Sequence, residues 1–245
     1  MFKDDPAPAN AAVPPAHPFG APLPGGTLGA LARSYNRIGG LADLLAQQTQ
    51  IDPVAVLSVW YVESGGAAFV AGQPIIRFEV HKFYAAWGAQ NRAAFDAHFQ
   101  FGGHDGVPGK SYQNHKFRPD PNTPWATFHG TQAGEYKVFN FAAGLANLEA
   151  ASLSTSFGGP QIMGSNHNDI GYATATALRA AFSAEERWQV LGFFDFCQHN
   201  SLIGDIRTKN WNAFGAGYNG NGAVYGPRIG DAFTAGAKLA TLPRQ

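Results

Sequence analysis

The residues Val54–Val62 constrain the fold more than any other part of the sequence, because the run carries no charge and is apolar on nearly every face. Asp52 and Pro53 precede it, an N-cap residue followed by a proline that suits the first helical position. Gly65 and Gly66 follow it and can adopt the positive backbone angles of a helix C-cap. Because a helix without a polar stripe belongs inside a core, the pattern predicts a buried helix.

A carboxylate, Glu63, stands at the end of this predicted helix. Desolvation and the partial negative charge of a helix C-terminus both raise the pKa of a carboxyl group. A carboxylic acid that stays protonated near neutral pH can donate its proton to a leaving oxygen, as the general acid does in glycoside cleavage. The alternative is that Glu63 lies on the exposed side of a frayed last turn, and the residues alone leave both interpretations open.

Glycoside cleavage also needs a second carboxylate, and Glu79 is the nearest candidate, 79 − 63 = 16 residues later. Branched residues and partial alternation predict a short strand over 74–81. The same alternation places Arg77 and His81 on the side of Glu79, so an ion pair or hydrogen bond within the strand is the competing interpretation. Three other carboxylates are further contenders: Asp96, Asp105 and Glu149.

The rest of the chain predicts a mainly α (α+β) single domain over 27–245, with a small β-hairpin region after the buried helix. The Pro- and Ala-rich residues 1–26 are typical of a tail or linker. Residues 88–132 lack periodicity and are predicted to form a long loop, beside which Trp125 is placed to stack on sugars. Ser183 and Glu186 match a capping box. The predicted helices are two short ones over 28–45 broken at Gly39-Gly40, and others over 135–152, 174–182, 184–199, 209–216 and 228–239.

Composition excludes several classes of function. Seventeen Lys and Arg residues balance seventeen Asp and Glu residues, so no basic field favours nucleic acid. No run of eighteen apolar residues predicts a membrane span, and no secretory signal is visible at the start. One cysteine and eight histidines without ligand spacing predict no disulfide framework, no metal site and no cofactor. We therefore expect synthesis in the cytoplasm, with export, injection or lysis bringing the protein to its place of action.

Four motifs, taken together and in order, resemble the N-acetylmuramidase family of phage endolysins and related bacterial cell-wall hydrolases. They span most of the chain from about residue 50 to 240 and are Val62–Gly66, Ile76–Phe83, Gln161–Gly164 and Tyr218–Gly220. The resemblance implies a lysozyme-like fold that cleaves the bond between N-acetylmuramic acid and N-acetylglucosamine in peptidoglycan. It also implies that Glu63 is the catalytic acid and that Glu79 and His81 belong to the cleft.

The resemblance further places Gln161 and Asn219 along a sugar groove, where their amides can pair with acetamido and hydroxyl groups. Tyr218 is expected to pack on a sugar face. The chain departs from the family at Leu153, where a carboxylate is expected, and Glu149 lies one helical turn earlier, 153 − 149 = 4 residues. Pro160 also replaces an aromatic residue.

Two alternatives stay open at this point. Attack by the muramyl 6-hydroxyl in place of water would make the enzyme a lytic transglycosylase. A weakly active or non-catalytic peptidoglycan-binding component of a phage tail or contractile injection apparatus would explain Leu153, with residues 1–26 as the contact to that apparatus.

Overall fold

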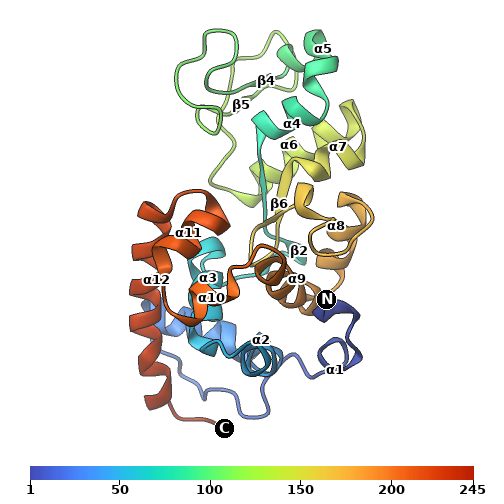
Figure 1. The fold of residues 1–245 in the computed structure, drawn as a ribbon. Helices are drawn as coiled ribbons and strands as arrows, with labels where there is room; N and C mark the ends of the chain where they lie inside the picture. The colour runs from blue at the N-terminus through green and yellow to red at the C-terminus, as the bar shows by residue number, and fades with distance from the viewer. The chain divides into compact units, whose positions relative to one another are not determined.

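The computed structural model describes residues 1–245, and helices predominate over short strands (Figure 1). The chain forms two compact units. The first comprises residues 1–74, 158–160 and 181–245, and the second comprises residues 75–157 and 161–180. The prediction of a mainly helical protein with a small sheet after the buried helix is confirmed. None of the helices has the length and apolar character needed to cross a membrane.

The first unit is built around α3, which packs against α2 and α12; in Figure 1 the red α12 runs beside the cyan α3. A two-stranded antiparallel sheet follows α3. The unit contains 3₁₀ helices Phe2–Asp4 and Ala237–Thr241, α1 (Pro6–Ala9), α2 (Gly26–Thr49), α3 (Pro53–Ser64), β1 (Phe69–Val70), β2 (Gln73–Pro74), α9 (Glu186–His199), α10 (Ile203–Arg207), α11 (Trp211–Asn219) and α12 (Gly222–Gly236). The helix α8 (Ala175–Ala184) ends in it.

The start and end of α3 are those that the sequence predicts. The Asp52 side chain accepts a hydrogen bond from the Val54 amide at 2.9 Å, and Pro53 occupies the first turn. Gly65 takes a left-handed conformation with φ of 66° and ends the helix. Trp60 is completely buried, as the absence of a polar stripe requires.

The helix α2 corrects one prediction, because it runs through Gly39-Gly40 without a break. A Cβ on Gly40 would lie 2.4 Å from the carbonyl oxygen of Pro14, and one on Gly39 would lie 2.8 Å from the Tyr35 ring. These glycines therefore allow close packing on a continuous helix. The neighbouring Leu and Ala residues favour helix strongly enough to offset the roughly 1 kcal/mol that each glycine costs.

The N-terminal segment is bound to the first unit by main-chain hydrogen bonds. The amides of Phe2 and Lys3 donate to the two carboxylate oxygens of Asp195, at 2.6 and 3.3 Å. Arg187 donates to the carbonyl oxygens of Ala9 and Ala11, at 2.9 and 2.6 Å. Residues 1–11 thus have defined partners on α9.

The second unit contains a three-stranded antiparallel sheet in the order β3-β6-β7, in which Arg77 pairs with Ser156 and Ser156 with Met163. A separate antiparallel pair joins β4 and β5. Its elements are β3 (Ile76–Phe78), α4 (Val80–Ala86), 3₁₀ helices Gly88–Gln90 and Gly164–Asn166, α5 (Arg92–Asp96), β4 (Phe99–Gln100), β5 (Lys116–Phe117), α6 (Gln132–Leu145), α7 (Leu148–Leu153), β6 (Thr155–Phe157) and β7 (Ile162–Met163).

Phenylalanine rings form the core of the second unit. Phe83 and Phe99 lie 5.2 Å apart between ring centroids, and Phe95 stacks on Phe99 at the same separation. Residues 88–132, predicted as a long loop, contain short helices and strands that contribute such rings. The prediction was wrong there because rings at irregular spacing produce neither a helical nor a strand period.

Three helix predictions also need correction. The helix predicted over 135–152 is two helices, since Asn147 caps α7 by accepting from the Ala150 amide at 2.8 Å. The capping box at Ser183 and Glu186 is wrong, because α8 extends to Ala184 and the N-cap of α9 is Glu185. The last two helices, α11 and α12, are displaced from the predicted ranges, with a left-handed Gly220 between them. The strand predicted over 74–81 ends at Phe78, so His81 belongs to α4.

Candidate active site

Glu63 lies in the last turn of α3, next to another helix terminus of the same unit. Asn219, the last residue of α11, donates a hydrogen bond from Nδ2 to Glu63 Oε1 at 2.6 Å. Glycines with positive φ end both helices, Gly65 at 66° and Gly220 at 75°. Each glycine lets its helix end within two residues of the functional side chain, because glycine adopts a positive φ without steric cost.

Burial raises the pKa of Glu63 to about 8, and the positive charge of Arg228 acts in the opposite direction. The carboxyl group is therefore largely protonated at neutral pH. The expectation of a raised pKa is confirmed, and the alternative of a fully solvated side chain is not. Glu63 as a whole is only partly buried, so some of its surface remains open to solvent.

A cavity of about 420 Å³ is lined by residues of α3 and α12 and is large enough for a small ligand group, although Glu63 itself is not part of its wall. Its wall includes residues on both sides of Glu63 in the chain, together with the charged pair Arg228 and Asp231 from α12. Thr27 and Tyr61, which also line it, are joined by a hydrogen bond of 3.1 Å between the two hydroxyl groups.

Tyr218 holds the end of α11 in place from within the unit. Its hydroxyl group donates to the carbonyl oxygen of Pro160 at 2.6 Å, and its ring stacks on Phe214 with 5.1 Å between centroids. Burial raises the pKa of Tyr218 well above its ordinary value. The ring thus has aromatic neighbours in the fold, and the hydroxyl bond positions the adjacent Asn219 against Glu63.

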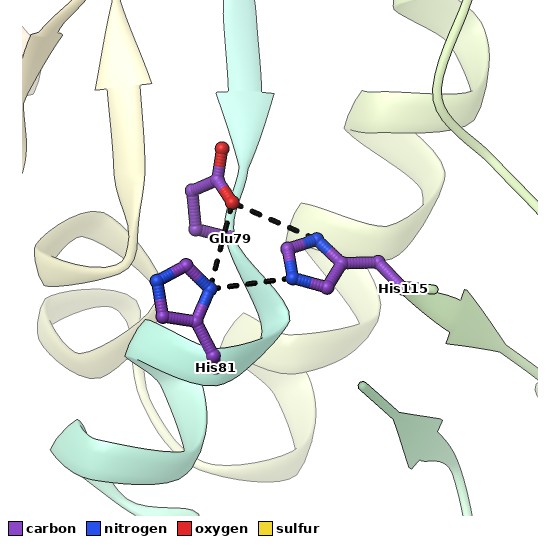
Figure 2. Close-up of side chains that lie close together, drawn as sticks. All are labelled: Glu79, His81 and His115. Carbon is purple, nitrogen blue, oxygen red and sulfur yellow. Dashed lines mark hydrogen bonds and ion pairs between the residues drawn. The ribbon is translucent and has the colours of Figure 1, made fainter. Parts of the chain in front are cut away.

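Glu79 follows β3 directly and stands at the N-cap of α4. Its Oε1 accepts from Nε of Arg77 at 2.8 Å, so the ion pair that the sequence suggested is confirmed. Its Oε2 is buried and receives no hydrogen bond. Nδ1 of His81 and Nδ1 of His115 each lie 3.6 Å from this oxygen, as Figure 2 shows.

His115 belongs to a hydrogen-bonded series that the sequence did not predict. Its Nδ1 lies 3.0 Å from Nε2 of His129, whose Nδ1 lies 2.7 Å from Oε1 of Glu135. The other oxygen of the buried Glu135 accepts from the Phe78 amide at 2.9 Å. Burial lowers the pKa values of His81 and His115 to about 4, so both rings are neutral at pH 7.

The other predicted groove residues in the second unit are Gln161 and Trp125. The Gln161 amide is engaged, since its Oε1 accepts from Ser156 Oγ at 2.8 Å and its Nε2 donates to the Ile75 carbonyl at 3.3 Å. The partly exposed Trp125 ring carries the Arg118 guanidinium group 4.1 Å from its centroid.

Glu149 has a structural task at the start of α8. It accepts from the amides of Ala175 and Thr176 at 2.8 and 2.9 Å, and from the Thr176 hydroxyl group at 2.6 Å. These bonds give Glu149 a structural role. Leu153, where the family resemblance leads us to expect a carboxylate, is the last residue of α7. The last two contenders, Asp96 and Asp105, both pair with Arg92.

The model of the Muramidase family, described as N-acetylmuramidase, matches residues 52–234, from the N-cap of α3 into α12. The chain belongs to the N-acetylmuramidase family. The crystal structure of the Burkholderia AP3 phage endolysin is similar to this chain, with a TM-score of 0.59 and 26% sequence identity. The similarity covers 81% of this chain and 70% of the endolysin chain. A comparison with curated proteins gives no significant match.

These findings confirm the family resemblance that the four motifs carried and the lysozyme-like, mainly helical fold expected from it. Membership of the family makes the protein a glycoside hydrolase of the peptidoglycan-cleaving class. The matched range includes the Glu63 site as well as the Glu79 cluster.

Proposed function

We propose that the protein cleaves the glycosidic bond between N-acetylmuramic acid and N-acetylglucosamine, with Glu63 as the general acid. The observation that carries the proposal is the burial of Glu63 in the last turn of α3, which raises its pKa to about 8, while neighbouring residues of the helix line a cavity. A group with this pKa is protonated at neutral pH and is still acidic enough to release its proton, which is the optimum for general acid catalysis.

The neighbours of Glu63 suit the proton transfer. When the proton moves to the glycosidic oxygen, the carboxyl group becomes negatively charged. The Asn219 Nδ2 group, 2.6 Å from Oε1, and the positive charge of Arg228 then stabilise the carboxylate that forms. Asn219 is thus a positioning residue, which Tyr218 holds in place.

We predict that Glu79 acts as the second carboxylate. It would stabilise the positive charge that develops on the sugar or position a water molecule. His81, Gln161, Tyr218, Asn219 and Trp125 are proposed to contact the glycan. Among these, Trp125 and Asn219 have partly exposed side chains that suit direct contact, while the Gln161 amide and the Tyr218 hydroxyl group are each engaged in a hydrogen bond within the protein.

The proposal is tested by the loss of turbidity of purified peptidoglycan with wild type, Glu63→Gln and Glu185→Gln. Removal of a general acid lowers the rate by roughly 10²–10⁴-fold, so Glu63→Gln should not clear the suspension. Glu185 is exposed and pairs only with Arg187, so its variant controls for loss of a carboxylate. The rate of wild type should fall as the pH rises through about 8.

Equal clearing by Glu63→Gln and wild type would contradict the proposal. If neither clears the wall and both sediment with it, the alternative of a non-catalytic wall-binding component of a phage tail or injection apparatus holds. Mass spectrometry of the released muropeptides separates hydrolysis from transglycosylation, since an anhydro product shows that no water was used.

A further inference from the structure

Three side chains of the second unit converge: Glu79, His81 and His115 (Figure 2). Their facing nitrogen and oxygen atoms are mostly hydrogen-bond acceptors, with too few donors to pair them. Glu79 follows β3, His81 lies on the first turn of α4, and His115 immediately precedes β5. One ligand-type atom from each lies within 4.8 Å of the others. The side chain of His115 is 1% exposed, whereas Glu79 and His81 retain 16% and 18%, which leaves an entry path.

The position of the ring hydrogens follows from Glu135. In the arrangement in which His129 carries one ring hydrogen, that hydrogen lies on Nδ1, 2.7 Å from Glu135 Oε1, because a carboxylate only accepts. Nε2 of His129 then accepts from Nδ1 of His115, at 3.0 Å. The second nitrogen of His115, Nε2, is therefore left with a bare lone pair.

That lone pair faces one further acceptor, the Ser111 carbonyl oxygen, and a ring nitrogen of His81. Nε2 of His115 lies 3.0 Å from the carbonyl oxygen of Ser111 and 3.2 Å from Nδ1 of His81. The buried Oε2 of Glu79 also receives no hydrogen bond. Nδ1 of His81 carries at most one hydrogen, which cannot serve both Nε2 of His115 and Oε2 of Glu79, 3.2 and 3.6 Å away. Buried acceptors that face one another without a donor are costly, and a cation among them removes that cost.

Two of the three separations between ligand atoms are close to those around a metal ion, and the third lies within 4.8 Å. Tetrahedral zinc with bonds near 2.0–2.1 Å separates its ligand atoms by about 3.3 Å. The observed separations are 3.2 Å from His81 Nδ1 to His115 Nε2 and 3.6 Å from His81 Nδ1 to Glu79 Oε2. Two imidazoles and one carboxylate are also a donor set that zinc accepts, with a position left for water or for the Ser111 carbonyl oxygen.

The surrounding groups orient the ligand atoms. Metal-binding histidines usually donate their second ring N–H to an acceptor that fixes the ring. His129, itself bonded to Glu135, is such an acceptor for His115. Arg77 holds Oε1 of Glu79 and so presents Oε2 to the site.

We propose that Glu79, His81 and His115 bind a divalent metal ion of the zinc class within the second unit. The ion joins the end of β3 and the start of α4 to the segment before β5, across 34 residues of the chain. This assignment and the predicted catalytic role of Glu79 both use Oε2, so they are alternatives for this residue. The metal site does not depend on the role of Glu63.

The experiment measures zinc binding by full-length protein that has been freed of metal by dialysis against a chelator. Isothermal titration in competition with a chromophoric chelator, with metal content checked by mass spectrometry, should give one zinc per wild-type chain. Glu79→Gln and His81→Asn should each weaken zinc binding at least about tenfold. Zinc should also raise the unfolding temperature of wild type and not that of Glu79→Gln.

His104→Asn is the matched control, because His104 belongs to a second group of histidine and carboxylate side chains, formed with Asp96 and Asp105. Arg92 already pairs with both aspartates there, so this variant should bind zinc as wild type does. Circular dichroism establishes that each variant is folded. The proposal is overturned if wild type takes up no stoichiometric zinc, if folded Glu79→Gln and His81→Asn bind it unchanged, or if His104→Asn loses it.

Discussion

At the scale of single residues, Glu63 shows how position in a fold determines acidity. The side chain is an ordinary glutamate, but it lies in the last turn of a helix whose middle residues are all buried. Desolvation favours the neutral form, and the positive charge of Arg228 offsets only part of that effect. The same environment that makes Glu63 a proton donor must lower the stability of the fold whenever the group ionises.

We therefore expect Glu63→Gln to be more stable than wild type at alkaline pH. The pKa of Glu63 in the folded protein is about 8, against 4.5 for the free side chain. The favourable contribution of the protonated group is complete below pH 4.5 and is lost as the pH rises through 8. Glutamine stays neutral, so its advantage should reach on the order of 2–4 kcal/mol at pH 8. Urea unfolding at pH 4.5 and 8 measures it; an advantage of the same size at both values would contradict the expectation.

Gly159 is a second residue whose surroundings decide its identity. Its amide donates to Oε1 of Gln189 at 2.8 Å, and a Cβ would lie 2.0 Å from the Trp60 indole ring. Gly159→Ala should lower the free energy of unfolding by about 1–3 kcal/mol, because the buried ring has no space to move. Chemical denaturation gives the value. Gly144→Ala is the control: no atom lies within 4 Å of its Cβ, and alanine favours the helix α6, so that variant should be as stable as wild type or more so.

At the scale of secondary-structure elements, helix termini in this protein depend on side chains that are distant in sequence. The helix α8 has its first amides bound by Glu149 from α7, 26 residues earlier. Burial raises the pKa of Glu149, but hydrogen bonds from the Thr176 hydroxyl group and the two amides lower it further, so it lies below its ordinary value. The charged form of Glu149 thus supports the fold.

Because the pKa of Glu149 is depressed, its contribution to stability is present above pH 4.5 and is lost as the pH falls through its value in the folded protein. Glu149→Gln should lower the free energy of unfolding by about 1 kcal/mol at pH 7, and by less at low pH. Thermal melts between pH 3 and 7 test this. Glu185→Gln serves as the control, since Glu185 occupies the N-cap of α9 without a side-chain cap bond. If Glu149→Gln lowers the free energy of unfolding by the same amount at low pH as at pH 7, the charge of Glu149 plays no part in stability.

At the scale of the whole molecule, the N-terminal segment completes the first unit. Asp195 on α9 is 2% exposed, and it accepts from the amides of Phe2 and Lys3. Burial raises the pKa of Asp195, while these bonds oppose the shift. Without the segment, a buried carboxylate would lose its donors.

Deletion of residues 1–24 should therefore lower the free energy of unfolding by at least about 2 kcal/mol, because a buried charged acceptor is left unsatisfied. Asp195→Asn in the shortened chain should recover part of the loss, since the amide carries no charge. Differential scanning calorimetry of the full and shortened proteins provides the comparison. If the shortened protein melts at the same temperature, residues 1–24 behave as the tail or linker that their composition suggests.

The helix α3 and its carboxylate could be predicted from the sequence because their causes are local. An Asp-Pro start, an apolar run and a pair of glycines act on neighbouring residues, and they determine where the helix begins, what it buries and where Glu63 stands. The four motifs likewise predicted the family, because each is a short continuous stretch. Composition and motif order thus determined the fold class.

Only the tertiary structure decided the rest. The close approach of Pro14 to Gly40 on α2 joins segments that are distant in the chain, and the cluster of Glu79, His81 and His115 depends on residues 34 positions apart meeting between β3, α4 and β5. Asn219 reaches Glu63 from 156 residues away. Such contacts leave no periodicity in the chain, because the free energy that selects them comes from packing and desolvation in the folded unit, and not from the conformational preference of any segment.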